Sequence, residues 1–433
     1  MNISKTKIVN LFAAVSVFIY LIYFLGSNIG YFENQLIFFD REDRFADIFK
    51  LIYSFSNIFS DQDFLNLDVP HNLIGSEKNP YAVIQSNGGL LNMSLPPLTI
   101  ILVVATANLA KLIGFHYSLV YIIYLAFLAT LLLRFYSSNL RENLTLVFIL
   151  FSFPLLFLIE RGNIWAAFSG CCLLMLFRSF VYKQELSSLD LFYFTLASSI
   201  RPNYLIFGLL FLTDRTLKSL VLKFVKVGVY FAISNSLFLF IAMKLYPGYD
   251  LGYFFYFIDQ YSYSDIRFTP WNSSLHGFIH NIYSIYLDSN YLRPSENIIK
   301  RLEEVVTGQA INNLILIIYL SILMASFVQF KQKKMSKTSF LTTACCVTAL
   351  ATSPFADYHL IIFIFLFFLI YDHYKNNSKH AIQLIMISLI LLPKLHAWSP
   401  DINIHSIINV LSLNILLFTS FIKRSKNSLF NTS

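Results

Sequence analysis

Apolar runs of membrane-spanning length fill most of this 433-residue chain, and they constrain its fold more than any other feature. A helix that crosses a bilayer needs about 20 predominantly apolar residues, and about a dozen windows of the sequence approach this length. Charged residues make up only 13% of the chain, whereas soluble domains contain about 25%. Because backbone polar groups in lipid must be bonded internally, these runs predict an all-α, polytopic integral membrane protein.

We expect residues 1–433 to form one transmembrane domain with about 11 to 13 helices. The first run follows Lys5 and Lys7 and has the form of a signal peptide, but no small-residue cleavage site follows it, so we expect an uncleaved span. The expected spans cover residues 8–25, 97–113, 118–135, 144–159, 164–182, 191–212, 224–245, 309–330, 339–353, 357–372, 380–396 and 403–421.

Lysine and arginine gather in short segments, which predicts the orientation because short basic loops stay cytoplasmic. If each expected span changes the side of the membrane, a parity count along the chain puts all these segments on one side. The long polar loops at about 27–95 and 246–308 then face outward. The net charge of +8 is therefore an orientation signal, and we expect no nucleic-acid partner. Richness in Ile, Phe, Asn and Lys is typical of proteins encoded by AT-rich genomes, and we therefore expect a bacterial cytoplasmic membrane. The basic segments contain Lys5, Lys7, Arg215, Lys218, Lys223, Lys226, Lys331, Lys333, Lys334, Lys337, Lys375, Lys379, Lys423, Arg424 and Lys426.

The four cysteines form two adjacent pairs inside apolar spans: Cys171 with Cys172 and Cys345 with Cys346. Neighbouring residues on a helix do not converge as metal ligands must, so we interpret both pairs as packing residues. We expect no metal and no other cofactor. The alternative of a divalent ion bound by the carboxylates of Asp40 and Asp47 is left open.

The first outer loop begins with an acidic segment from Asp40 to Asp47. Apolar residues follow at helical spacing, so we expect an amphipathic helix in the membrane interface. A carboxylate placed there is suited to take a proton from a sugar hydroxyl. The alternative is a solvated acidic face paired with its own arginines. The apolar positions are Phe45, Ile48, Phe49, Ile52 and Tyr53.

Three further places put polar residues at the ends of apolar runs, where they cost free energy unless they are paired or line a wet cavity. Arg161 and Asn163 occupy a turn that is either an ordinary charged turn or a phosphate site. Arg201 precedes a proline and interrupts an apolar run, which favours a cavity-lining break. His359 begins an aromatic-rich span and is either a local hydrogen-bonding group or a phosphate donor.

These pieces occur in an order that resembles glycosyltransferase family 87, a group of membrane glycosyltransferases of the C fold class. The similarity covers about residues 40–370, and each motif alone is short. Leu95 stands where the family usually has tyrosine, and Arg201 where it usually has lysine. The similar positions are Asp47 with Phe49, Pro80-Tyr81, Pro96-Pro97, Gly162-Asn163, Arg201-Pro202, Asn272 to Leu275, and Ser353-Pro354 with His359.

The resemblance implies an inverting hexosyltransferase that moves a mannose-like sugar from a polyprenyl-phosphate donor to a glycolipid or glycan acceptor at the outer face of the membrane. It implies Asp47 as the base, with Asp40 and Asp43 as alternatives. The phosphate-binding candidates are Arg161, Arg201 and His359; the sugar- or acceptor-binding candidates are Asn163, Asn272 and Tyr358.

Parity raises one difficulty, because it puts residues 160–163 on the cytoplasmic side, away from Asp47. The difficulty disappears if the break at 198–203 turns the chain back as two half-helices and if residues 97–135 cross the bilayer an odd number of times in total. A flippase or transporter for a lipid-linked saccharide and a polysaccharide polymerase are the competing interpretations, since both also need many spans and intramembrane arginine.

Overall fold

The computed structural model describes residues 4–28, 96–112, 148–149, 152–161, 163–212, 217–245, 274–275, 278–279, 309–352, 357–372, 378–393 and 404–421. Within these ranges every regular element is a helix and no strand occurs, which confirms the all-α class for this part of the chain. The acidic segment from Asp40 to Asp47 and most of both long loops lie outside the described residues.

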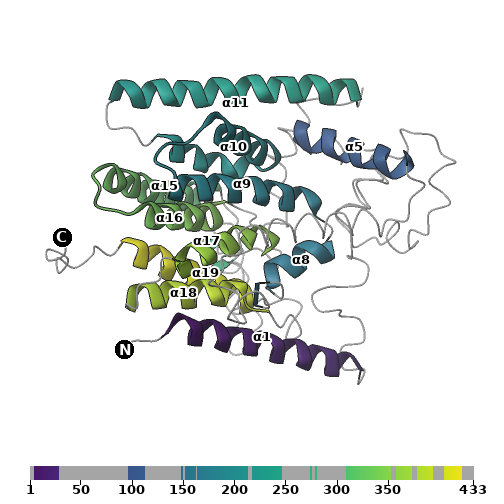
Figure 1. The fold of residues 1–433 in the computed structure, drawn as a ribbon, viewed down its shortest axis with the longest axis vertical. Helices are drawn as coiled ribbons and strands as arrows, with labels where there is room; N and C mark the ends of the chain where they lie inside the picture. Colours follow the sequence, from purple (N-terminus) through teal and green to yellow (C-terminus); the bar gives the residue numbers. More distant parts are fainter. Residues whose placement is uncertain are drawn as a thin grey trace, which may run out of the picture.

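The helices lie side by side in layers, with α1 and α11 at opposite edges (Figure 1). Their bounds follow the apolar runs, and for α9 they coincide with the expected span. The elements are α1 (Lys5–Asn28), α5 (Pro97–Leu112), α8 (Phe153–Arg161), α9 (Ile164–Tyr182), α10 (Ser188–Ile200), the 3-10 helix η4 (Pro202–Phe211), α11 (Leu217–Leu245), α15 (Gln309–Lys331), α16 (Lys337–Ala351), the 3-10 helix η6 (Asp357–Ile361), α17 (Ile362–Asp372), α18 (Ser378–Leu391) and α19 (Ile404–Phe421).

Three of the described helices are long and apolar enough to cross a membrane by length and composition: Ile164–Tyr182, Lys218–Leu245 and Asn313–Lys331. Several others are apolar but shorter. These helices are compatible with membrane insertion, and the larger span count stays a prediction.

Helix α17 forms the centre of the bundle. Every residue from Ile362 to Tyr371 is buried, so the helix is apolar all round and has neighbours on all sides. Helix α11 is the opposite case, because large apolar side chains such as Leu222, Phe224 and Ile233 are exposed along it. Exposed apolar surface of this extent indicates contact with lipid or with another apolar partner.

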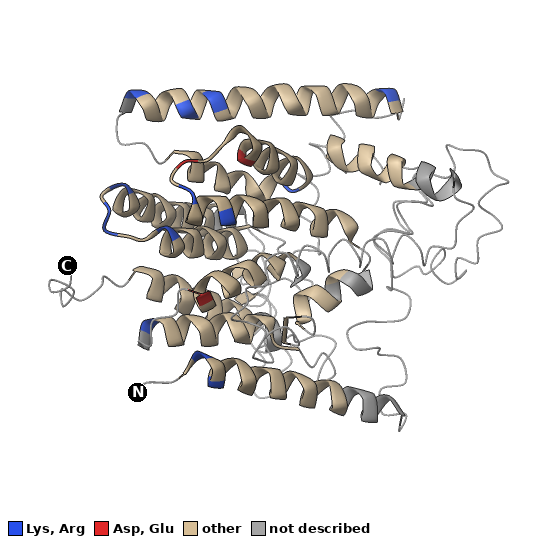
Figure 2. Ribbon diagram, in the orientation of Figure 1, with Lys and Arg blue, Asp and Glu red and all other residues tan. Residues whose placement is uncertain are grey.

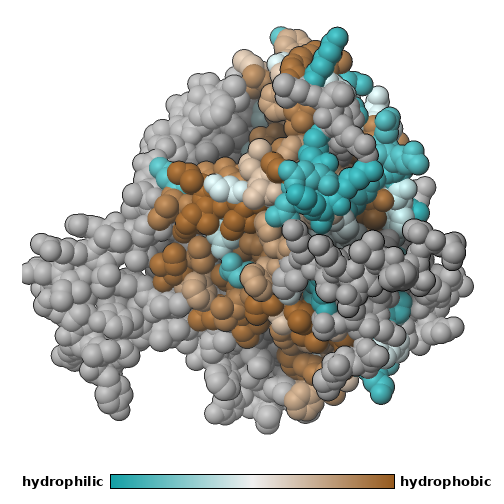
Figure 3. Space-filling model, turned by 90° about the vertical axis from the view of Figure 1, so that its left-hand side faces the viewer, coloured by the Kyte–Doolittle hydropathy of each residue, from teal (hydrophilic) through white to brown (hydrophobic). Residues whose placement is uncertain are grey.

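Lysines gather at one end of the bundle, which we call the basic end (Figure 2). It contains the starts of α1, α11, α16 and α18 and the end of α15. Hydrogen bonds tie it together: Lys5 Nζ donates to the Tyr371 carbonyl at 3.3 Å, Lys331 Nζ to the Leu212 carbonyl at 3.3 Å, and Lys337 Nζ to the Lys183 carbonyl. Figure 3 looks onto this end and shows a hydrophilic patch beside a hydrophobic surface. The basic segments that the structure describes thus share one end, as the charge pattern predicted; which side of a membrane it faces stays a prediction.

Asp190 fixes the start of α10 at the basic end. Its carboxylate accepts hydrogen bonds from the Ser187 amide at 2.7 Å and the Ser187 hydroxyl at 2.6 Å, and Lys183 Nζ lies 3.3 Å away. The Ser187 hydroxyl in turn caps the Asp190 amide, which completes a capping box. Burial alone would raise the pKa of Asp190, but hydrogen bonds from Ser179 and Ser187 and the charge of Lys183 lower it below its ordinary value.

We expect Asp190→Asn to reduce the free energy of unfolding by about 1–2 kcal/mol at neutral pH, because it removes a charged cap. A carboxylate with a lowered folded-state pKa stabilises the fold above its unfolded-state pKa, and this contribution is lost as pH falls through the folded-state value. The gap in thermal midpoint between wild type and variant should therefore close in acid. Glu185→Gln, at an exposed position in the same loop, is the control. A gap that persists unchanged in acid would show that Asp190 does not act through its charge.

The chain reverses direction between α10 and η4. Proline disfavours the helical conformation in the residue before it, and Arg201 accordingly has φ −132° and ψ 95°, with Pro202 opening η4. Helix α10 has 13 residues and η4 has 10, so each is about 20 Å long, against about 30 Å for a bilayer core. The two pieces pack on each other, and Ser187 and Leu212 both lie at the basic end. The single span expected over 191–212 is therefore wrong, and the alternative of two half-helices is confirmed.

Candidate functional site

Asn163 begins α9 at the end opposite the basic end, since α9 finishes next to Lys183. Its side chain is 4% exposed, and its Oδ1 accepts a hydrogen bond from the Ala166 amide at 2.9 Å. Asparagine is favoured at this capping position because its oxygen satisfies an amide that has no partner within the helix. The turn before α9 and the basic end thus lie at opposite ends of one helix. Asp47 and residues 113–147 lie outside the described residues, so it stays a prediction that this turn and Asp47 share one side.

Arg201 joins the end of α10 to the start of α9. Its Nη2 donates to Asn163 Oδ1 at 3.3 Å, across 38 positions of sequence. The same oxygen therefore caps α9 and holds the guanidinium. This gives Asn163 a positioning role that the sequence did not predict, beside the sugar-binding role that remains untested.

His359 reaches the same place from the C-terminal half of the chain. It lies in η6, is 6% exposed, and is within electrostatic range of Arg201. Its ring meets the Tyr204 ring edge to face, with centroids 6.5 Å apart and planes at 87°. We call Asn163, Arg201, Tyr204 and His359 the arginine cluster. Asn163, Arg201 and His359 were predicted from the sequence and Tyr204 was not, although its place three residues after Arg201 in the broken apolar run was a usable signal.

A close approach of α9 and η6 positions His359. A Cβ atom added at Gly170 of α9 would lie 3.1 Å from Ile361 Cγ2, two residues beyond His359, so the helices pack without room for a larger side chain. Glycine is required here by contact and not by backbone conformation.

We expect Gly170→Val to push η6 away from α9 and to destabilise the protein by about 1–3 kcal/mol, the usual cost of overpacking. Because His359 moves with η6, any activity of the arginine cluster should fall as well. Gly228→Val is the matched control, since a Cβ there meets nothing within 4 Å. Thermal unfolding of both variants in detergent measures the difference, and equal midpoints would contradict the close packing.

Several buried polar atoms lie near the same end of the bundle. Among the residues that the structure describes, Trp165 Nε1, Ser198 Oγ and Ser199 Oγ are buried and have no hydrogen-bond partner. Trp165 is in the first turn of α9 and packs in one cluster with Ile200, next to the arginine cluster. Thr99 Oγ1, on α5, is likewise buried and has no hydrogen-bond partner. An unsatisfied buried polar group costs about 1–3 kcal/mol and calls for an explanation, and a polar ligand provides one.

The local charge favours an anion. The N-termini of α9 and η4 lie at this end and carry partial positive charge, but the C-termini of α8 and α10 lie there too, so the helix dipoles partly offset each other. The Arg201 guanidinium adds a full positive charge with a planar set of donors that matches phosphate oxygens. Half-helices that end inside a membrane protein place the same kind of N-terminus at anionic substrate groups.

The remaining predicted residues cannot be placed. Asp40, Asp43, Asp47 and Asn272 lie outside the described residues. Arg161 ends α8 and Tyr358 is in η6, but their side chains lie outside them too. Among the described side chains, no group of three or more His, Cys, Asp or Glu could hold a metal ion. All four cysteines are free and buried, as expected for packing residues.

Comparison of the chain with protein-family models, with curated protein sequences and with solved structures gives no match. The arginine cluster and the order of the sequence motifs are therefore what indicate a function for this chain.

Proposed function

We propose that this chain is an inverting membrane glycosyltransferase of the C fold class, which transfers a mannose-like hexose from a polyprenyl-phosphate donor to a glycolipid or glycan acceptor. The observation that carries the proposal is the convergence of Asn163, Arg201 and His359. These residues were selected from separate motifs: Asn163 accepts a hydrogen bond from Arg201, and the buried His359 lies within electrostatic range of Arg201 and against Tyr204.

The proposed reaction needs few groups. The acceptor hydroxyl attacks the anomeric carbon, the bond from that carbon to the phosphate oxygen breaks, and the configuration inverts. Asp47 takes the hydroxyl proton, and polyprenyl phosphate leaves with the bonding electron pair. Arg201, with Arg161, stabilises the negative charge that grows on the phosphate, and His359 donates to a phosphate oxygen.

Topology supports a lipid-linked donor. With the basic end in the cytoplasm, the arginine cluster faces the outer side of a bacterial cytoplasmic membrane, where nucleotide sugars are absent. A chain with about 11 to 13 spans and an interfacial helix in its first outer loop offers a polyprenyl chain a path from the bilayer to this site.

One observation favours a second candidate, a transporter or flippase for a lipid-linked saccharide. The reversal between α10 and η4 is the kind of broken helix that transporters place at their binding sites. Transporters usually carry such breaks as a pair in two repeated halves, and the described residues contain one reversal of this kind. A carrier should tolerate Asp47→Asn, whereas an enzyme that uses this carboxylate as base should not.

The decisive assay supplies purified full-length protein with polyprenyl-phosphate mannose or glucose, or with nucleotide sugars, and a panel of glycolipid and glycan acceptors. We expect transfer from a polyprenyl-phosphate hexose alone. His359→Leu should lower the rate about tenfold or more, because leucine cannot donate a hydrogen bond to the leaving phosphate. His380→Leu, at a half-buried position near the basic end of α18, should leave it unchanged. Transfer from nucleotide sugars, or no transfer with any donor, would contradict the proposal.

A further inference from the structure

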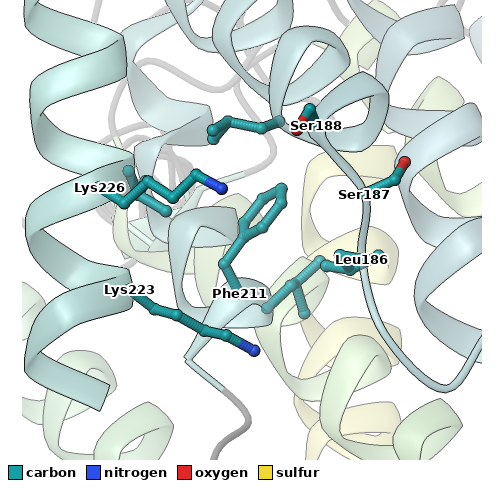
Figure 4. A pocket seen from close by; sticks show the side chains of 9 residues that line it. Leu186, Ser187, Ser188, Phe211, Lys223 and Lys226 are labelled. Carbon is teal, nitrogen blue, oxygen red and sulfur yellow. The ribbon is translucent and has the colours of Figure 1, made fainter. Parts of the chain in front are cut away.

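A pocket with a volume of about 210 Å³ opens at the basic end, between α11 and the start of α10 (Figure 4). Lys223 and Lys226 extend into it from α11, and Ser187 and Ser188 lie across from them. Leu186 and Phe211 form part of its apolar wall. The pocket is at the opposite end of α10 from the arginine cluster, so the two sites are separate.

The described residues that line this pocket carry a positive charge, from Lys223 and Lys226. The two lysines are three positions apart on α11, so they share one face of that helix. Asp190 lies behind Ser187, is 1% exposed, and is held by Ser187 and Lys183. Glu185 belongs to the same loop but does not line the pocket. A ligand entering the pocket therefore meets two ammonium groups and the Ser188 hydroxyl.

The flanks of α11 beside the pocket are apolar. Leu222 and Phe224, each about 100° around the helix from Lys223, are exposed by 66% and 63%. A small soluble anion gains no free energy from contact with such an apolar surface, whereas an acyl chain does. Lysine side chains at the end of a membrane helix lay their methylene groups along apolar surface and extend the ammonium group toward the headgroup layer.

We propose that this pocket binds the phosphate of an anionic membrane lipid, with Lys223, Lys226 and Ser188 at the headgroup and an acyl chain along α11. The inference rests on the proposed membrane location with the basic end in the cytoplasm, and it is independent of the proposed transfer reaction. Each lysine close to an anionic headgroup strengthens binding about fivefold, so the pair contributes roughly 10- to 30-fold.

The test uses the full-length protein in detergent with Ser188→Cys as a reporter. The native cysteines are all buried, so maleimide labelling reports the introduced thiol. Dioctanoyl phosphatidylglycerol should slow labelling in a saturable way, and dioctanoyl phosphatidylcholine and inorganic phosphate should not. Lys223→Gln with Lys226→Gln should raise the half-saturating concentration at least tenfold. Lys218→Gln, on the same helix but outside the pocket lining, should leave it unchanged.

A second measurement needs no reporter residue: phosphatidylglycerol should raise the thermal midpoint of the wild type and not that of the double variant. Equal protection in the double variant, or no protection at all, would overturn the proposal. Protection by inorganic phosphate as strong as by the lipid would assign the pocket to soluble phosphate compounds instead. Loss of lipid binding with sugar transfer intact would refute only this inference and not the proposed function.

Discussion

Arg201→Gln should lower sugar transfer about 100-fold or more while the protein still folds. Removing one preorganised group that stabilises developing negative charge costs about 100- to 1,000-fold in comparable enzymes. Asn163 would still cap α9 through the Ala166 amide, so the fold around the site should survive. The measurement is the rate of hexose transfer from the polyprenyl-phosphate donor at saturating acceptor, with thermal unfolding measured beside it.

Two companion variants separate charge from structure. Arg201→Lys keeps the charge and loses the planar fork, so it should retain more activity than Arg201→Gln. Arg178→Gln removes an arginine from an exposed position near the other end of α9 and should have little effect. Equal rates for Arg201→Gln and Arg178→Gln would remove Arg201 from the proposed role.

Asp47→Asn should lower the transfer rate by about 100- to 10,000-fold, the usual contribution of a general base. The change keeps the size of the side chain and removes only its ability to take a proton. Asp40→Asn and Asp43→Asn test the two alternative bases in the same loop, and we expect both to stay near the wild-type rate. Normal turnover by Asp47→Asn with a large loss in one of the others would reassign the base, and normal turnover in all three would favour a carrier.

Much of the helical layout follows from local sequence. The apolar runs at 164–182, 309–330 and 403–421 give helices within a residue or two of their expected bounds, because charged and polar residues border them. The break at Arg201 is also local, since the following proline disfavours a helical conformation there. The reversal itself is not, because it depends on the packing of α10 against η4, and the single span expected over 191–212 was wrong. The described basic segments share one end as the charge pattern predicted.

The contacts of the site are not local, and the sequence predicted them only in part. Asn163 and Arg201 meet because α9 and α10 pack together, and no periodicity encodes a bond across 38 residues. Trp165 and Thr99 look like ordinary packing residues in apolar runs, and their importance appears only once their burial and the missing partners of Trp165 Nε1 and Thr99 Oγ1 are known. Tyr204 also looks like a packing residue, and only its ring contact with His359 connects it to the site. The lysine pocket depends in the same way on how α11 lies beside α10.

Cysteine labelling in intact cells tests the central claim most directly, because that claim places the arginine cluster outside and the basic end inside. Asn203→Cys reports the exposed turn beside Arg201, and Lys334→Cys reports the exposed turn between α15 and α16. A membrane-impermeant maleimide should label Asn203→Cys in intact cells and Lys334→Cys only after permeabilisation. Labelling of both from the same side, or of Lys334→Cys alone, would contradict the account.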